Sequence, residues 1–177
     1  MKARLWKAIA AVAVTLMMTL SVSWNAVATP QRHDYELEGT WLVTVTQKNC
    51  STGATLSAFH SILTFADGGS MAEDTTNPAF GPGQRGSGQG YWRYEGRRAF
   101  YAKSIAFINY TTASPNPPMV PPFKAGTQTI EQTIEFMQDN PDEWASTATV
   151  KFLDSNGVAY SPSPVAPCIT AVGVRFK

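Results

Sequence analysis

From residue 39 to the C-terminus, hydrophobic and polar side chains alternate with a period of two, which is typical of half-buried β-strands and not of helices. These segments are rich in β-branched and aromatic residues. Asp67–Gly69, Gly96 and Asp139–Asp142 have the composition of tight turns. The pattern predicts eight strands, at residues 39–48, 56–65, 70–75, 88–95, 98–110, 127–137, 144–153 and 169–176.

The connections between these segments alternate in length. Those after the second, fourth and sixth strands are tight, whereas residues 49–55, 76–87, 111–126 and 154–167 form longer connections. In an up-and-down meander, every second connection lies at the same end. We therefore predict an all-β fold, an eight-stranded antiparallel up-and-down barrel with one closed end and one loop-lined mouth. A two-sheet sandwich is the alternative.

The first 28 residues have a different pattern. Lys2, Arg4 and Lys7 precede the apolar run Ala8–Leu20, and Ala26-Val27-Ala28 has the small-x-small spacing of a signal-peptide cleavage site. The run has 13 residues, whereas a membrane-spanning helix needs about 20. We predict a cleaved signal peptide at 1–28, an N-terminal segment at 29–38 and a β-barrel domain at 39–177. The protein is then secreted or periplasmic, with no membrane span in the mature chain.

Two cysteines, Cys50 and Cys168, remain after cleavage. Two cysteines in an exported domain most simply form one disulfide. Cys50 lies just after the first predicted strand, and Cys168 lies at the start of the last one. These two strands are neighbours in a closed barrel. We therefore predict a disulfide that closes the barrel between its first and last strands.

Gly39-Thr40-Trp41, at the start of the first strand, resembles the Gly-x-Trp motif of the lipocalins, eight-stranded barrels that carry small apolar ligands. Lipocalins also pack an arginine from the end of the last strand over this tryptophan at the closed end, and Arg175 has the matching position. If Cys50 lies opposite Cys168, Trp41 faces Lys177, and Arg175 is its diagonal neighbour, within reach of a cation–π contact. The chain is similar to the lipocalins or the wider calycin group. As a whole it also resembles exported bacterial proteins with this strand pattern, a similarity that implies no activity.

Charge and residue usage weigh against several functions. Three of the 14 basic residues lie in the signal segment, which leaves 11 against 13 acidic residues and no basic run, so nucleic acid is not an expected partner. Two histidines, His33 and His60, are too few for a metal site when the cysteines form a disulfide. Gly81–Gly86 fits G-x-G-x-x-G but lacks the flanking strand and helix of a nucleotide-binding turn. We expect no cofactor, no metal and no catalytic residue.

The expected function is binding of a small hydrophobic molecule inside the barrel. An eight-stranded barrel either packs solid or holds one small ligand, and small inward residues such as Ala106, Ala148 and Gly173 leave space. Two alternatives stay open: a barrel-type cyclase or isomerase, and a filled barrel that acts as an envelope or interaction module. The expected ligand contacts are Trp92, Phe100 and Ala106 on the strands and Phe80, Met119 and Phe123 on the loops at the mouth.

Overall fold

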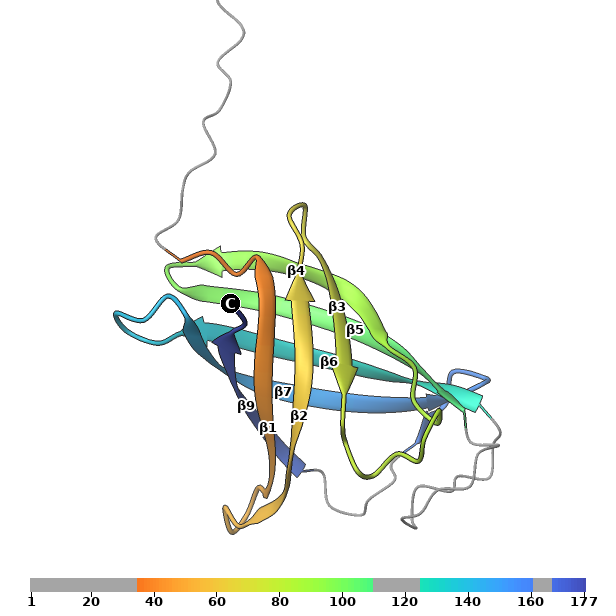
Figure 1. Cartoon of the computed structure of the whole chain (residues 1–177). Coiled ribbons are helices and arrows are strands. Elements are labelled where there is room, and N and C mark those ends of the chain that lie inside the picture. Colours follow the sequence, from red (N-terminus) through yellow and green to blue (C-terminus); the bar gives the residue numbers. More distant parts are fainter. Residues whose placement is uncertain (1–34, 110–124, 161–166) are drawn as a thin grey trace, which may run out of the picture. The chain divides into compact units, whose positions relative to one another are not determined.

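The computed structural model of the chain describes residues 35–109, 125–160 and 167–177. Every helix or strand assigned in these residues is a β-strand (Figure 1). The strands are β1 (Gly39–Asn49), β2 (Thr55–Phe65), β3 (Ser70–Thr75), β4 (Gly88–Gly96), β5 (Ala99–Asn109), β6 (Ala125–Phe136), β7 (Glu143–Asp154), β8 (Ala159–Tyr160) and β9 (Pro167–Arg175).

Eight antiparallel strands close into an up-and-down barrel. From β1 to β7, each strand pairs with the next one along the chain, and β9 pairs with both β7 and β1 to complete the ring. The predicted fold class is therefore confirmed, with strand ends within two residues of the predicted ones. The pattern missed β8, whose two residues pair with Phe152 and Leu153 of β7, because a two-residue strand has no periodicity to detect.

Tight turns join the strands at one end of the barrel, here called the closed end. They connect β2 to β3, β4 to β5 and β6 to β7, and the strand ends that border the longer connections lie at the opposite end, the mouth. Gly68 and Gly96 have φ values of +83° and +112° in these turns. Glycine adopts such values at no steric cost, which explains the turn signals in the sequence.

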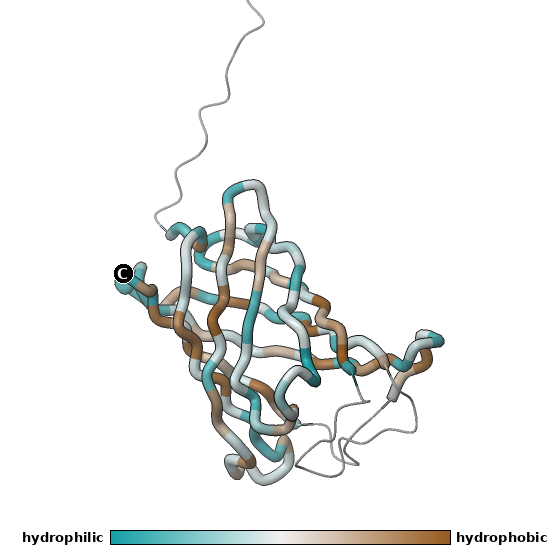
Figure 2. Tube along the Cα trace, turned by 45° about the vertical axis from the view of Figure 1, so that its right-hand side comes forward, coloured by the Kyte–Doolittle hydropathy of each residue, from teal (hydrophilic) through white to brown (hydrophobic). Residues whose placement is uncertain are grey.

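Aromatic side chains fill the closed end. Figure 2 shows hydrophobic and more hydrophilic residues alternating along the strands, and one of the two faces of each strand points inward. Trp41 on β1 is fully buried, and its ring centroid lies 5.7 Å from that of Phe136 and 5.8 Å from that of Trp144. Leu37, just before β1, is also fully buried, and its carbonyl oxygen accepts a hydrogen bond from Trp41 Nε1 at 2.8 Å. The segment that enters β1 is thus part of this core.

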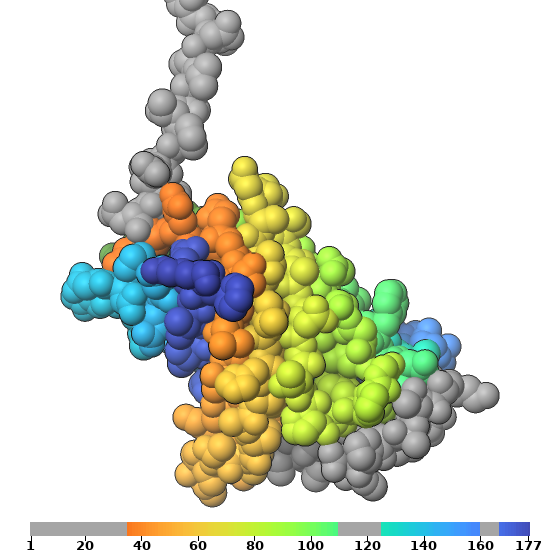
Figure 3. All heavy atoms as spheres, in the orientation of Figure 1, coloured from red at the N-terminus to blue at the C-terminus, as the bar shows by residue number. Residues whose placement is uncertain are grey.

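The seam between β1 and β9 carries the predicted disulfide, which the structure confirms. Figure 3 shows the C-terminal residues against β1. The predicted register, however, is wrong by two residues, since Trp41 pairs directly with Arg175 and Lys48 with Cys168. The reason is that Cys50 lies one residue beyond the end of β1. The disulfide therefore joins positions that are not direct strand partners, with a Cα–Cα distance of 5.1 Å.

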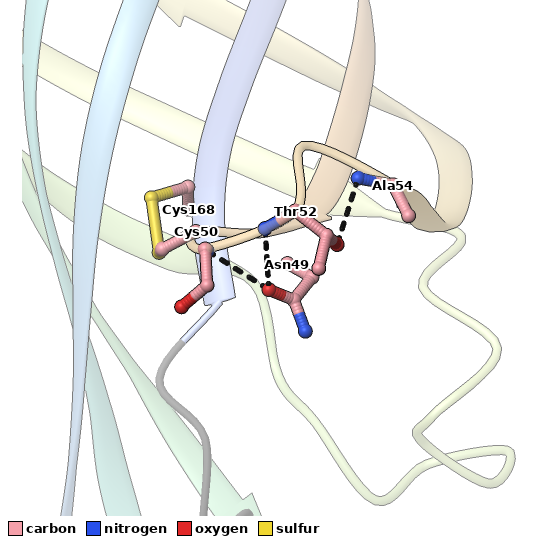
Figure 4. The surroundings of a disulfide bond; sticks show 6 residues. Asn49, Cys50, Thr52, Ala54 and Cys168 are labelled. Carbon is pink, nitrogen blue, oxygen red and sulfur yellow. Dashed lines mark hydrogen bonds between the residues drawn. A yellow bond between two sulfur atoms is a disulfide. The ribbon is translucent and has the colours of Figure 1, made fainter.

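The turn that holds Cys50 is fixed by side-chain hydrogen bonds (Figure 4). The Asn49 side-chain oxygen accepts hydrogen bonds from the backbone N–H groups of Ser51 at 2.9 Å and Thr52 at 3.1 Å. The N–H of Ala54 donates to the Thr52 hydroxyl at 3.3 Å. An Asx-type turn of this kind sets the direction of the chain after β1, so the cysteine is held on an ordered segment beside β9.

Candidate functional site

On part of the barrel wall, inward-facing side chains change from buried to half-exposed between the closed end and the mouth, whereas those of β5 are buried from Phe100 to Ile108. On β7, Trp144 and Ser146 are buried, whereas Ala148, Val150 and Phe152 are half-exposed. The pairing of β7 with β9 ends at Ala148, so Val150 and Phe152 lie beyond it, where β7 pairs with β6 and β8. The same change occurs on β1 and β2, where Val45, Gln47, Ser57 and Phe59 are half-exposed. On β6, Ile130 is half-exposed, but Gln128 and Gly126, nearer the mouth, are buried.

One wall of the mouth half contains a buried ion pair. Glu73 on β3 and Arg85, in the connection between β3 and β4, have side-chain exposures of 7% and 5%. Arg85 donates from one terminal nitrogen to a carboxylate oxygen of Glu73 and from Nε to the side-chain oxygen of Gln128 on β6. These three residues, which we call the polar bridge, link β3 to β6 across the inner faces of β4 and β5.

Small residues on β4 and β5 make room for the polar bridge. A Cβ atom on Gly88 would lie 2.4 Å from Cγ of Glu73, so the Glu73 side chain occupies the space that a larger residue on β4 would fill. On β5, the inward residues Ser104 and Ala106 are buried, and Ala106 is directly paired with Gln128. The sequence therefore places its smallest inward side chains where the bridge crosses.

The connection between β3 and β4 is packed against the end of β5, and this packing positions Arg85. Arg85 forms a single antiparallel bridge with Ile108. The N–H of Gly86 donates to the carbonyl of Phe107 at 2.9 Å, and the N–H of Asn109 donates to the carbonyl of Gln84 at 2.7 Å. Backbone hydrogen bonds on both sides of Arg85 thus hold its guanidinium at the inner wall.

The other polar groups inside the mouth half are uncharged. The Ser146 hydroxyl donates to the side-chain oxygen of Gln132 at 3.3 Å, and both residues are buried. The hydroxyls of Ser61 and Ser57 donate to neighbouring side chains on β3 and β1, each at 3.0 Å. Glu73 carries the charge among the described inward-facing strand residues between the aromatic closed end and the rim. The guanidinium of Arg85 neutralises this charge.

The ligand contacts predicted from the sequence do not lie together. The rings of Trp92 and Phe100 belong to the aromatic closed end, 5.8 Å apart by centroid. Ala106 lies in the mouth half beside the polar bridge, and Phe80 is half-buried in the connection between β3 and β4. Met119 and Phe123 lie outside the described residues, as does the predicted signal peptide at 1–28.

The interior space differs from the sequence prediction at Gly173. A Cβ atom there would lie 2.2 Å from the indole of Trp144, so the ring already fills the space expected to be free. Ala148, in contrast, is half-exposed on the inner face of β7. The half-exposed inward side chains of β7 therefore lie toward the mouth, beyond the aromatic core.

Sequence reasoning missed the polar bridge. Glu73 alternates with Met71 on the short third strand, so its inward position was detectable as a carboxylate on the core-facing side. Gly88, on the inner face of β4, was a second signal, because a glycine within a strand often marks a place where another group lies close to the backbone. Arg85 gave no such signal, because its position depends on how a glycine-rich connection folds.

No protein-family model matches this chain, and no curated protein matches it. The structure shows a closed eight-stranded antiparallel barrel, with Arg175 over Trp41, which is consistent with a calycin-like fold. Membership of the lipocalins stays a prediction from the sequence. In the part of the chain that the structure describes, there is no apolar helix of membrane-spanning length. The same residues contain no group of three potential metal ligands.

Proposed function

We propose that this protein is an exported binding protein that holds one small molecule with an apolar body in the mouth half of its barrel. The observation that carries the proposal is the band of half-exposed apolar side chains on the inner face, Val45, Phe59, Ile130, Val150 and Phe152. Covering such a band is favourable by about 25 cal/mol per Å² of apolar surface removed from water. The seam disulfide fits an oxidising compartment outside the cytoplasm.

Two features favour binding over the alternatives. A filled barrel that serves only as an interaction module would bury its inward side chains along its whole length, whereas here burial decreases from Trp144 to Phe152 on a single strand. A cyclase or isomerase needs a group that is free to move a proton. Glu73, the inward-facing carboxylate beneath the rim, is engaged by Arg85 instead.

The test uses the neutral fluorescent probe N-phenylnaphthylamine and the mature, disulfide-bonded protein. Ala148→Phe adds a large side chain to the inner face of β7, and Ala145→Phe adds the same side chain to the outer face of the same strand. We expect saturable binding to the wild type and to Ala145→Phe, and at least about tenfold weaker binding to Ala148→Phe. Absence of saturable binding to the folded wild type, or equal binding to both variants, contradicts the proposal. Native mass spectrometry of protein purified from its own host identifies the natural ligand.

A further inference from the structure

We infer that the ligand carries an uncharged, hydrogen-bonding head group on its apolar body, and that this head group contacts the polar bridge of Glu73, Arg85 and Gln128. The inference rests on the proposed function and adds the chemical class of the ligand. It would apply to long-chain alcohols and amides and would exclude carboxylates and ammonium ions of the same chain length.

Charge balance is the first argument. The carboxylate of Glu73 and the guanidinium of Arg85 neutralise each other at the inner wall. The remaining polar side chains there, such as those of Gln128, Gln132 and Ser104, are amides and hydroxyls. A charged head group would lose its hydration without gaining a counter-charge, and burial of an unpaired charge is costly. A neutral head group avoids this penalty.

Unused hydrogen-bonding capacity is the second argument. The side-chain NH₂ of Gln128 and the second carboxylate oxygen of Glu73 have no partner among the described residues. In the described part of the chain, the fully buried side-chain polar atom that lacks a hydrogen-bond partner is Trp144 Nε1, so the free groups of the bridge are not completely shielded from solvent. They offer one donor and one acceptor, and a hydroxyl or amide head group can bond to both at once.

The apolar band adjoins the polar bridge, which lets one molecule contact both. Gln128 on β6 is directly paired with Phe152 on β7, and the next inward pair is Ile130 with Val150. Two residues along β6 therefore separate the hydrogen-bonding surface from the apolar one. A head group at Gln128 would place its chain against Ile130, Val150 and, across the barrel, Phe59.

The wild-type protein alone provides a first test. Decanol, decanamide, decanoate and decylammonium share one chain and differ in the head group, and their affinities are measured near pH 7 by displacement of N-phenylnaphthylamine. We expect the two neutral compounds to bind at least about tenfold more tightly than either ion. Equal or tighter binding of decanoate or decylammonium overturns the inference while leaving the proposed function intact. If no member of the series binds and the neutral probe itself does not bind, the proposed function fails as well.

Substitution of the bridge provides the second test. Glu73→Gln keeps the size and the hydrogen-bond acceptor but leaves the guanidinium of Arg85 without its counter-charge. We expect decanoate to gain at least about tenfold in affinity relative to decanol. Glu131→Gln is the matched control, because Glu131 also forms an ion pair, with Lys103 at 3.0 Å, but on the outer face of β6. An unchanged preference in folded Glu73→Gln, or the same change in Glu131→Gln, overturns the inference. If Glu73→Gln does not fold, the wild-type series decides.

Discussion

The guanidinium of Arg175 lies over the indole ring of Trp41, with Cζ 4.3 Å from the ring centroid. The two residues are direct partners across β1 and β9. Arg175 also donates hydrogen bonds to the carbonyls of Glu36 at 2.6 Å and Glu38 at 2.7 Å, and its Nε donates to Asp142 at 3.0 Å. A single side chain thus connects the last strand to the first strand, to the segment before it and to the turn between β6 and β7.

Arg175→Ala tests the importance of this connection for stability. The substitution removes a partly buried cation–π contact and three hydrogen bonds to the backbone carbonyls of Glu36, Glu38 and Pro141. We expect a loss of about 1–3 kcal/mol in the free energy of unfolding. Urea unfolding followed by tryptophan fluorescence measures it. Arg93 provides the control, because it lies at the same 4.3 Å distance over the ring of Tyr101 but is 55% exposed. If Arg93→Ala shifts the urea midpoint as much as Arg175→Ala, the closed end does not depend on Arg175.

The disulfide between Cys50 and Cys168 closes a long loop, with a sequence separation of 118 residues. On the chain-entropy model, such a cross-link stabilises the folded state by up to about 5 kcal/mol. We expect the Cys50→Ser, Cys168→Ser double variant to unfold at a markedly lower urea concentration than the oxidised wild type. Thiol labelling of unfolded, unreduced wild type should detect no free cysteine. Two reactive thiols per chain would show that the barrel is held closed without the bond.

Local patterns predicted most of the barrel. Alternation and turn composition are properties of neighbouring residues, so the strands and tight turns followed directly from them. The cysteine pair followed from topology, because the first and last strands of a barrel meet. The register of that pair did not, since the position of Cys50 outside β1 depends on the turn formed by Asn49.

The candidate site depended on non-local contacts and was largely missed. The alternation of side chains along the strand correctly predicted that Ala106 points inward. It did not show that the residue paired with Ala106 on β6 is Gln128, which accepts a hydrogen bond from Arg85. Small side chains were interpreted as free space. At Gly173 that space is filled by Trp144. At Gly88, for which no free space was predicted, the Glu73 side chain lies where a Cβ atom would be. Which residue fills a gap is decided by partners from distant parts of the chain, and composition alone does not identify them.

Gly173→Ala tests the packing of the closed end. The new Cβ would lie 2.2 Å from the Trp144 ring, which is fully buried between β9 and the aromatic core and has no free direction in which to move. We expect a loss of about 3 kcal/mol in the free energy of unfolding. Gly86→Ala is the control, because its nearest neighbour would be the Phe107 carbonyl oxygen at an ordinary 3.7 Å. Equal stability of the two variants in thermal unfolding would contradict this packing.

Asp142 should make the closed end sensitive to acid. Lys177 Nζ lies 2.6 Å from one carboxylate oxygen and Arg175 Nε lies 3.0 Å from the other. The hydrogen bond from Lys177 and the charges of both partners outweigh some loss of hydration and hold the pKa of Asp142 below its ordinary 3.8.

The pH dependence of stability follows from this lowered pKa. Because the folded state favours the anion, the stabilisation is present above pH 3.8 and is lost as the pH falls through the pKa of Asp142 in the folded protein. We therefore expect Asp142→Asn to lower the urea midpoint near pH 7 and to match the wild type once the pH has fallen through the lowered pKa of Asp142, with a smaller difference at pH 7 in high salt. Asp67 lies in the exposed turn between β2 and β3 and has no ion pair among the described residues. Asp67→Asn should therefore leave the urea midpoint unchanged both near pH 7 and in acid. A difference between Asp142→Asn and wild type that persists unchanged in acid would mean that the carboxylate acts through packing and not through its charge.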